Sequence, residues 1–221
     1  MDEKELIAKY NIDIEALKRE QIKLAKNLVI KDSMDFSLAT RFGAIENLCI
    51  KNKIISAIIV CDKICNIIEQ QYFFDKLKFP YLHGFRSYRE MPAMIEAFNK
   101  LSEKPDVVFI HGHGICHPRL GLASHFSLST NVPTIGVAGE LFEENKIEDN
   151  GEDILLGDKK VGKVLRSKEK ANPLFISPGD KISIETAYNI SKSFIRLPHK
   201  LPEPLHLAHK YAKNVRKELR I

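Results

Sequence analysis

The fold is decided by residues 38–73, which read LATRFGAIENLCIKNKIISAIIVCDKICNIIEQQYF. Two short polar breaks, at 51–53 and 62–63, divide this stretch into three segments rich in apolar and β-branched residues, the composition that favours β-strands. Because connections this short join only antiparallel neighbours, the stretch predicts a three-stranded antiparallel meander. The predicted strands are 38–49, 54–62 and 64–73.

Two further strands alternate with helices after the meander. Val107-Val108-Phe109-Ile110 is a short apolar run that ends near glycines, as buried parallel strands do. Three antiparallel strands followed by βα units predict one mixed α/β sheet with helices on both faces, an order that resembles the ribonuclease H-like architecture. The other predicted elements are strands 106–111 and 132–137, helices 12–30, 89–102, 119–130, 182–195 and 204–219, and a hairpin over 153–167 that turns at Gly157-Asp158.

Length and composition indicate an ordinary globular protein. The chain has 221 residues, a formal net charge of +5, 44% hydrophobic and 29% charged residues, which excludes a disordered or fibrous chain. No apolar run approaches the about 18 residues of a membrane span, and the acidic N-terminus is not typical of a signal peptide. We expect four reduced cysteines, a cytoplasmic location and no membrane partner. The expected domain is 1–221, with an N-terminal helix at 12–30, a core at about 38–137 and C-terminal additions at 150–221.

The most chemically distinctive stretch follows the predicted strand 106–111 and reads FIHGHGICHPR over residues 109–119. Its glycines permit close approach of a ligand to the backbone, and the end of a parallel strand is where open α/β sheets place ligand sites. The stretch matches neither a dinucleotide-binding fingerprint nor a zinc finger. Structural roles and a metal or catalytic role both remain open for its three histidines, His111, His113 and His117.

Three further side chains carry groups suited to chemistry. Glu46 shares a strand face with apolar neighbours by the period of two, and a carboxylate there is costly unless it is paired or bound to a cation. The alternative is a slipped register or an edge position. Glu90 lies near the start of a predicted helix, where it could simply favour the helix dipole. His209 lies beside the apolar stripe of the last predicted helix, where a satisfied core histidine is the alternative.

Many short motifs occur in a recognisable order from about residue 40 to the end. They are Phe79-Pro80-Tyr81, Arg89-Glu90, Lys104-Pro105-Asp106-Val107-Val108, Gly112, Gly114, His117-Pro118-Arg119, Gly121-Leu122-Ala123-Ser124-His125, Pro133-Thr134-Ile135-Gly136-Val137-Ala138, Arg166, Lys168, Ile176-Ser177-Pro178-Gly179, Leu197-Pro198, Pro202-Glu203-Pro204 and Leu207-Ala208-His209. In these motifs the chain resembles the endonuclease V family, metal-dependent enzymes that nick nucleic acid near deaminated bases such as inosine. The resemblance also implies the ribonuclease H-like fold.

The resemblance implies roles for individual residues. A metal held by Glu46 and His111, with Glu90 and His209 as further catalytic residues, would activate water against a phosphodiester. The residues expected to bind nucleic acid are Tyr81 as a wedge, Gly112, Gly114 and Ile115 as the lining of a pocket for an extruded base, and Gly84, His117, Arg119, Arg166 and Lys168.

Several positions depart from the family pattern. Glu46 and His111 stand where the family has aspartates that bind metal, Gly139 replaces a lysine, and Arg86 replaces an apolar residue of the base pocket. The Pro-Tyr-x-Pro wedge motif ends in His83. Mg²⁺ prefers hard oxygen ligands, whereas two carboxylates and two imidazoles suit Mn²⁺, Fe²⁺ or Zn²⁺ better.

These departures leave three functions open. We expect first an endonuclease V-type nuclease that hydrolyses a phosphodiester near deaminated bases in DNA or RNA repair. The alternatives are a catalytically impaired homologue that acts as a nucleic-acid-binding module, and a metalloenzyme with another substrate. The expected cofactor is a divalent metal (Mg²⁺ or Mn²⁺ from the family, Mn²⁺ or Zn²⁺ from the substituted ligands), or none for the binding module. The expected partner is nucleic acid and the expected assembly state is a monomer.

Overall fold

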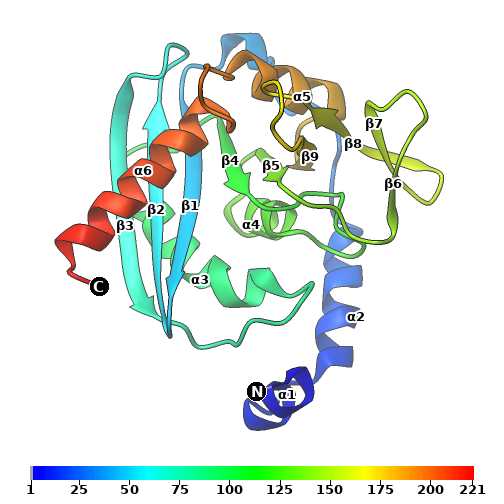
Figure 1. Cartoon of the computed structure of the whole chain (residues 1–221), viewed down its shortest axis with the longest axis vertical. Coiled ribbons are helices and arrows are strands. Elements are labelled where there is room, and N and C mark those ends of the chain that lie inside the picture. The colour runs from blue at the N-terminus through cyan, green and yellow to red at the C-terminus, as the bar shows by residue number, and fades with distance from the viewer. Residues whose placement is uncertain (1) are drawn as a thin grey trace.

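A nine-stranded mixed sheet organises the computed structural model, which describes residues 2–221 (Figure 1). The strand order is β3 (Ile67–Lys76), β2 (Lys53–Cys61), β1 (Phe42–Ile50), β4 (Val107–His111), β5 (Thr134–Ala138), β9 (Leu174–Asp180), β8 (Lys159–Leu165), β7 (Asp153–Leu156) and β6 (Asn145–Ile147). β1, β2 and β3 pair antiparallel, whereas β1, β4 and β5 pair in parallel. The prediction of one mixed sheet that begins with an antiparallel meander is therefore confirmed.

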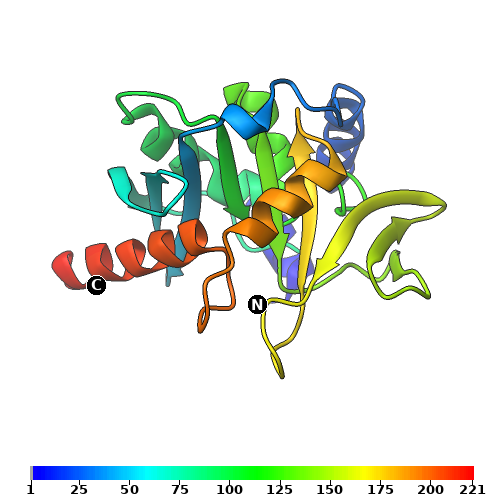
Figure 2. The ribbon, with the colours of Figure 1, turned by 90° about the horizontal axis from the view of Figure 1, so that it is seen from above.

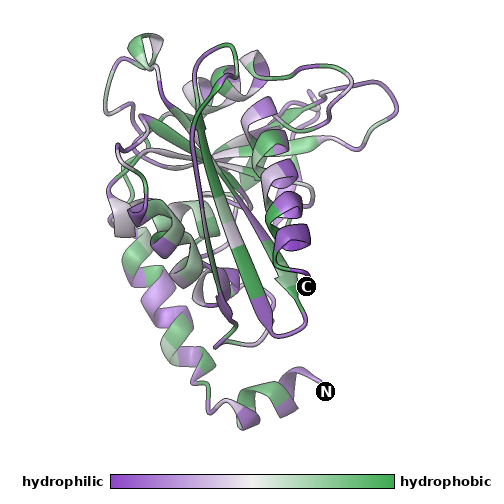
Figure 3. Cartoon of the chain, turned by 90° about the vertical axis from the view of Figure 1, so that its left-hand side faces the viewer, coloured by the Kyte–Doolittle hydropathy of each residue, from purple (hydrophilic) through white to green (hydrophobic). Residues whose placement is uncertain are grey.

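Helices cover both faces of this sheet (Figures 1 and 2). The helices are α1 (Glu3–Lys9), α2 (Ile14–Ala25), α3 (Arg86–Asn99), α4 (Leu122–Thr130), α5 (Ile184–Ser193) and α6 (Glu203–Glu218), of which α3, α4, α5 and α6 pack on the sheet. Hydrophobic residues run along the central strands, between helices that each have a hydrophilic side (Figure 3). α3 and α4 pack in the core on one face of the sheet, and α5 and α6 pack in the core on the other face. The amphipathic helices α3, α5 and α6 bury an apolar side there and leave a polar side to solvent.

Side chains of β1 alternate between two hydrophobic cores. Ala44 packs in the core with Leu205 of α6, and Ile45 packs in the other core with Met94 of α3. Since successive side chains on a strand point to opposite faces, Glu46 points toward the α6 side and Asn47 toward the α3 side. The middle of β1 can therefore offer polar groups to both helices.

Local side-chain caps shorten two of the predicted strands. Phe36–Leu38 form a 3₁₀ helix capped by the Asp35 carboxylate, so β1 begins only at Phe42. The Asp62 carboxylate accepts hydrogen bonds from the backbone amides of Ile64 and Asn66 and closes a turn before β3. Short acidic side chains compete for backbone donors in this way, and they end or delay regular structure.

Helix α1 and strands β6 and β9 were not among the predicted elements. The sequence Ser177-Pro178-Gly179 of β9 is typical of a turn. Pro178 is tolerated because β8 pairs with β9 only as far as Ile176, so the missing proline N–H removes no ladder hydrogen bond on that side. The predicted hairpin of β7 and β8 is present, with Gly157 at φ +60° in its turn.

No helix within residues 2–221 has both the length and the apolar character needed to cross a membrane.

Burial of α6 against the sheet can be tested with two leucines. Leu205 of α6 is 0% exposed, whereas Leu38 is 71% exposed. Leu205→Ala should lower the free energy of unfolding by about 2–5 kcal/mol, because it leaves a cavity in the core. Leu38→Ala should change it by less than about 0.5 kcal/mol. Urea unfolding measures both, and an equal loss in the two variants would contradict this packing.

Candidate active site

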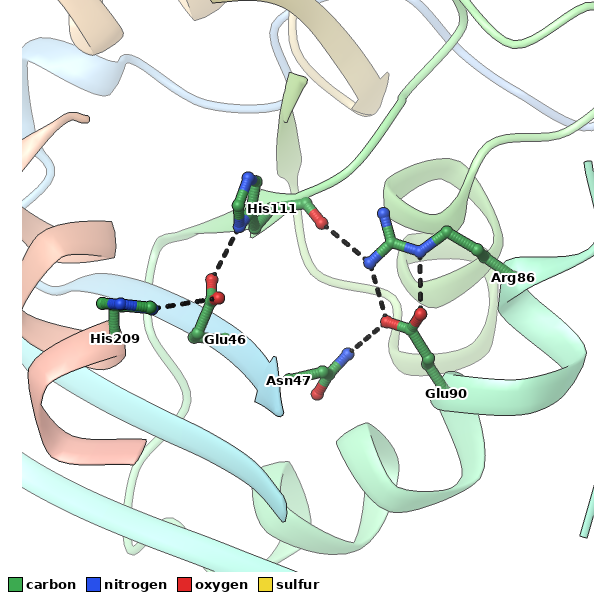
Figure 4. A network of polar contacts seen from close by, with 6 residues as sticks. All are labelled: Glu46, Asn47, Arg86, Glu90, His111 and His209. Carbon is green, nitrogen blue, oxygen red and sulfur yellow. Dashed lines mark hydrogen bonds and ion pairs between the residues drawn. The ribbon is translucent and has the colours of Figure 1, made fainter. Parts of the chain in front are cut away.

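Glu46 is a buried carboxylate at the centre of a polar network near the carboxyl end of β4 (Figure 4). Its Oε2 lies 2.8 Å from His111 Nδ1 and its Oε1 lies 3.3 Å from His209 Nδ1. Burial raises the pKa of Glu46, but hydrogen bonds and charge from His111 and then His209 outweigh it and hold that pKa below its ordinary value. The group is therefore a carboxylate at neutral pH. Since a carboxylate only accepts, each imidazole carries its proton on Nδ1 and keeps Nε2 free.

Glu90 belongs to a second half of the network and is paired with an arginine. Its carboxylate accepts from Arg86 Nε at 2.7 Å and Arg86 Nη2 at 2.8 Å, and from Asn47 Nδ2 at 2.9 Å. Arg86 Nη2 also donates to the backbone carbonyl of His111 at 3.3 Å. A bidentate guanidinium–carboxylate pair of this kind is among the stronger polar interactions in proteins.

The structure brings the four predicted catalytic side chains into one network, in two directly bonded sets. Glu46, His111 and His209 contact one another through the carboxylate, whereas Glu90 joins them through Arg86 (Figure 4). The expectation that Glu90 lies at the start of its helix is wrong, because α3 begins at Arg86 and places Glu90 one turn later. The i,i+4 spacing of an arginine and a glutamate was the sequence signal for this pair.

A cavity of about 160 Å³ lies beside the network. Arg86 and Gly84 line it, together with Phe142, whose ring centroid lies 4.9 Å from that of His83, 4.8 Å from His113 and 4.6 Å from His117. Burial lowers the pKa of His113. Nothing in the local sequence around Phe142 indicated that it would contact three histidines.

His117 is fixed as a neutral imidazole in the wall of this cavity. It is 6% exposed, its Nδ1 accepts from the backbone N–H of Arg119 at 3.0 Å, and its Nε2 donates to the Gly84 carbonyl at 3.1 Å. Burial, with a smaller contribution from the charge of Arg119, lowers the pKa of His117 to about 3. The side chain of Arg119 also donates to Gln21 Oε1 at 2.7 Å and ties α2 to this wall.

Known proteins resemble this chain in sequence and in fold. The sequence profile of the family described as endonuclease V matches residues 22–210. An endonuclease V of Thermosipho melanesiensis is 35% identical over 201 residues, which cover 88% of this chain and 84% of that protein. The chain belongs to the endonuclease V family. The catalytic domain of human endonuclease V superposes with a TM-score of 0.84 at 25% identity, over 94% of this chain and 99% of that one.

Solved endonuclease V structures also confirm the ribonuclease H-like fold. The Bacillus subtilis endonuclease V has a TM-score of 0.84 at 25% identity, over 96% of this chain and 95% of that one. Ciona intestinalis endonuclease V, solved in complex with DNA that contains an inosine, has a TM-score of 0.84 at 24% identity, over 93% of this chain and 98% of that one.

The endonuclease V family is generally dependent on a divalent metal ion, and the network here does not fit Mg²⁺. Mg²⁺ demands hard oxygen ligands in octahedral geometry, but all four carboxylate oxygens of Glu46 and Glu90 already face protein donors. The Arg86 guanidinium adds a fixed positive charge directly on Glu90. Within residues 2–221, three possible ligand atoms lie within 4.8 Å of one another at one place, which is formed by His199, Glu203 and His206. Among these described residues, the network around Glu46 has no such gathering of three ligand atoms.

The other residues expected to bind nucleic acid divide into exposed and packed groups. Tyr81 is 59% exposed at the rim of the cavity, and Arg166 and Lys168 are exposed on the surface. Gly112, Gly114 and Ile115 do not line this cavity among the described residues. A Cβ on Gly114 would lie 2.1 Å from the Pro178 carbonyl oxygen, so this glycine serves close backbone packing. Ile115 packs in the small core below β8.

Tyr81→Ala should weaken binding of inosine-containing nucleic acid. Base–aromatic stacking contributes about 1–3 kcal/mol per base, which corresponds to a Kd about 5- to 150-fold higher. Fluorescence anisotropy with a labelled oligonucleotide measures this. Tyr10→Ala is the matched control, since Tyr10 is also exposed, at 45%, but lies at the end of α1. Equal affinities of the two variants would exclude a wedge role for Tyr81.

His117 should contribute to loss of stability in acid. Its folded-state pKa of about 3 lies below the ordinary value of 6.5, so between these values the unfolded chain binds a proton that the folded chain does not. The free energy of unfolding therefore falls as pH decreases through this window. His117→Gln should make that dependence shallower in urea unfolding at several pH values. A wild-type slope in His117→Gln would contradict the burial argument.

Proposed function

We propose that this chain recognises nucleic acid containing a deaminated base such as inosine, and that it does so without the Mg²⁺-dependent strand cleavage implied by its family. The observation that carries the proposal is the bidentate pair of Arg86 with Glu90, reinforced by the bond from Arg86 to the His111 carbonyl. The guanidinium places a permanent cation within the network in which a metal-dependent nuclease would gather carboxylates around an ion.

The charge of the network supports this proposal. Glu46 and Glu90 contribute two negative charges and Arg86 one positive charge, so the network carries a net charge of −1 when His111 and His209 are neutral. A site with aspartates at 46 and 111 and an apolar residue at 86 would carry −3. Because affinity for Mg²⁺ depends on anionic oxygen ligands, the substitutions lower both the charge and the number of oxygens that an ion could use.

Recognition is supported by features that the substitutions leave in place. Tyr81 presents an exposed ring beside a cavity of about 160 Å³, and aromatic rings stack on unpaired bases. The endonuclease V of Ciona intestinalis, which shares this fold, was solved with DNA that contains an inosine. The net charge of +5 also favours a polyanionic partner.

Strand cleavage with a softer metal is the second candidate function. It is supported by the donor set of Glu46, His111 and His209, one carboxylate with two imidazoles whose Nε2 atoms are free. Nitrogen donors suit Mn²⁺ or Zn²⁺ better than Mg²⁺. This candidate requires the two imidazoles to turn toward a common point, since their ligand atoms and the carboxylate are not gathered in the arrangement described above.

A restored variant separates these functions. Glu46→Asp, Arg86→Leu and His111→Asp combined return two short carboxylates and remove the internal cation, so the triple variant should gain Mg²⁺-dependent nicking of an inosine-containing oligonucleotide. The wild-type chain should bind the same oligonucleotide and leave it intact in Mg²⁺. Gel assays with Mg²⁺, Mn²⁺ and Zn²⁺ measure nicking, and anisotropy measures binding.

Two controls accompany this assay. Arg86→Leu alone removes the cation without returning the aspartates and should not nick, and an oligonucleotide with adenine in place of inosine controls for the base. Nicking by the wild-type chain in Mg²⁺ would overturn the proposal, and nicking only in Mn²⁺ or Zn²⁺ would favour the second candidate.

A further inference from the structure

Three ligand-type side chains meet where α6 begins, outside the network around Glu46. The ligand atoms of His199, Glu203 and His206 all lie within 4.8 Å of one another. His199 Nδ1 lies 2.7 Å from Glu203 Oε2, and the imidazole rings of His199 and His206 stack with centroids 3.5 Å apart and planes at 15°. No other set of three within residues 2–221 is gathered in this way.

Backbone hydrogen bonds hold the three residues in place. The Glu203 N–H donates to the Phe194 carbonyl at 2.8 Å, and the His199 N–H donates to the Arg196 carbonyl at 2.9 Å. These bonds fold the segment before α6 back onto the helix. Leu205, which is fully buried between Glu203 and His206, anchors the first turn of the helix in the core. The cluster is therefore tied to the end of α5 and to the buried first turn of α6, which helps to pre-position ligands as a metal site requires.

The donors and their exposure fit a transition-metal ion. Two imidazoles and one glutamate form a ligand set that zinc uses when it keeps an open position. Tetrahedral ligand atoms at about 2.1 Å from an ion lie about 3.4 Å from one another. The three ligand atoms here lie within 4.8 Å of one another, so small side-chain rotations would bring them to the distances that an ion requires. The side chains of His199 and Glu203 are 34% and 14% exposed, which leaves a route from solvent.

We propose that His199, Glu203 and His206 bind a first-row transition-metal ion, with Zn²⁺ as the probe ion, and leave at least one position for water or a phosphate oxygen. The site is separate from the Glu46 network, because His209 directs its Nδ1 to Glu46. It is also close to that network, because His206 and His209 are three residues apart on one helix, about 4.5 Å along its axis. A bound ion would add a positive charge at the start of α6, about one turn from His209.

A purely structural role is the rival explanation, since His199 and Glu203 could simply hydrogen-bond at the start of the helix. Isothermal titration of Zn²⁺ into the full chain separates the two. The wild-type chain should bind one Zn²⁺ ion at this site. His199→Asn and His206→Asn should each weaken Zn²⁺ binding at least tenfold. Loss of an outer-shell partner already lowers metal affinity about 10- to 100-fold, and loss of a direct ligand should cost no less. His209→Asn, a histidine change on the same helix, should leave Zn²⁺ binding unchanged.

A second measurement needs no variant and so does not depend on how the variants fold. Zn²⁺ should protect His199 and His206 of the wild-type chain from modification by diethyl pyrocarbonate, read by peptide mass spectrometry, and should leave His83 as reactive as before. Zn²⁺ affinity that is unaffected by His199→Asn and His206→Asn would overturn the proposal. So would loss of Zn²⁺ binding in His209→Asn, because the ion would then belong to the Glu46 network, and so would the absence of protection at His199 and His206.

Discussion

The buried carboxylate of Glu46 is the constraint on which the arrangement of the site depends. Glu46 is 5% exposed on an apolar strand face, so its negative charge must be compensated. Its two partners, His111 of β4 and His209 of α6, lie 65 and 163 residues further along the chain. The hydrogen bonds therefore fix how α6 lies across β1 and how β4 ends beside it. Removing either imidazole would leave part of a buried charge unpaired, which costs more than the bond itself contributes.

Arg86 gives the same kind of compensation on the other side of the sheet. Asn47 follows Glu46 on β1 and points to the opposite face, where it donates to Glu90, and Arg86 completes this second set. The two sets meet at the His111 carbonyl. The Arg86 guanidinium thus neutralises Glu90, and the two imidazoles hydrogen-bond the carboxylate of Glu46.

Arg86 also connects this network to the cavity that it lines. A base that entered the cavity would contact the guanidinium that neutralises Glu90, so the proposed recognition would depend on the same side chain as the electrostatics of the network. The neutral, fixed imidazole of His117 and the ring of Phe142 form other parts of the wall. Aromatic and hydrogen-bonding groups in a small cavity are what recognition of a planar base requires.

Local sequence determined the central strands, the β7–β8 hairpin and the positions of most helices, because periodic burial and turn chemistry act over a few residues. It also placed Glu46 on an apolar face and identified His111 and His209 as candidates. Only the tertiary structure placed Arg86 against the His111 carbonyl, Phe142 against three histidines, and the turn-like Ser177-Pro178-Gly179 inside β9. Each of these depends on which segments are neighbours in space, and a hydrogen bond or ring contact between residues far apart in sequence leaves no periodic signal in either segment.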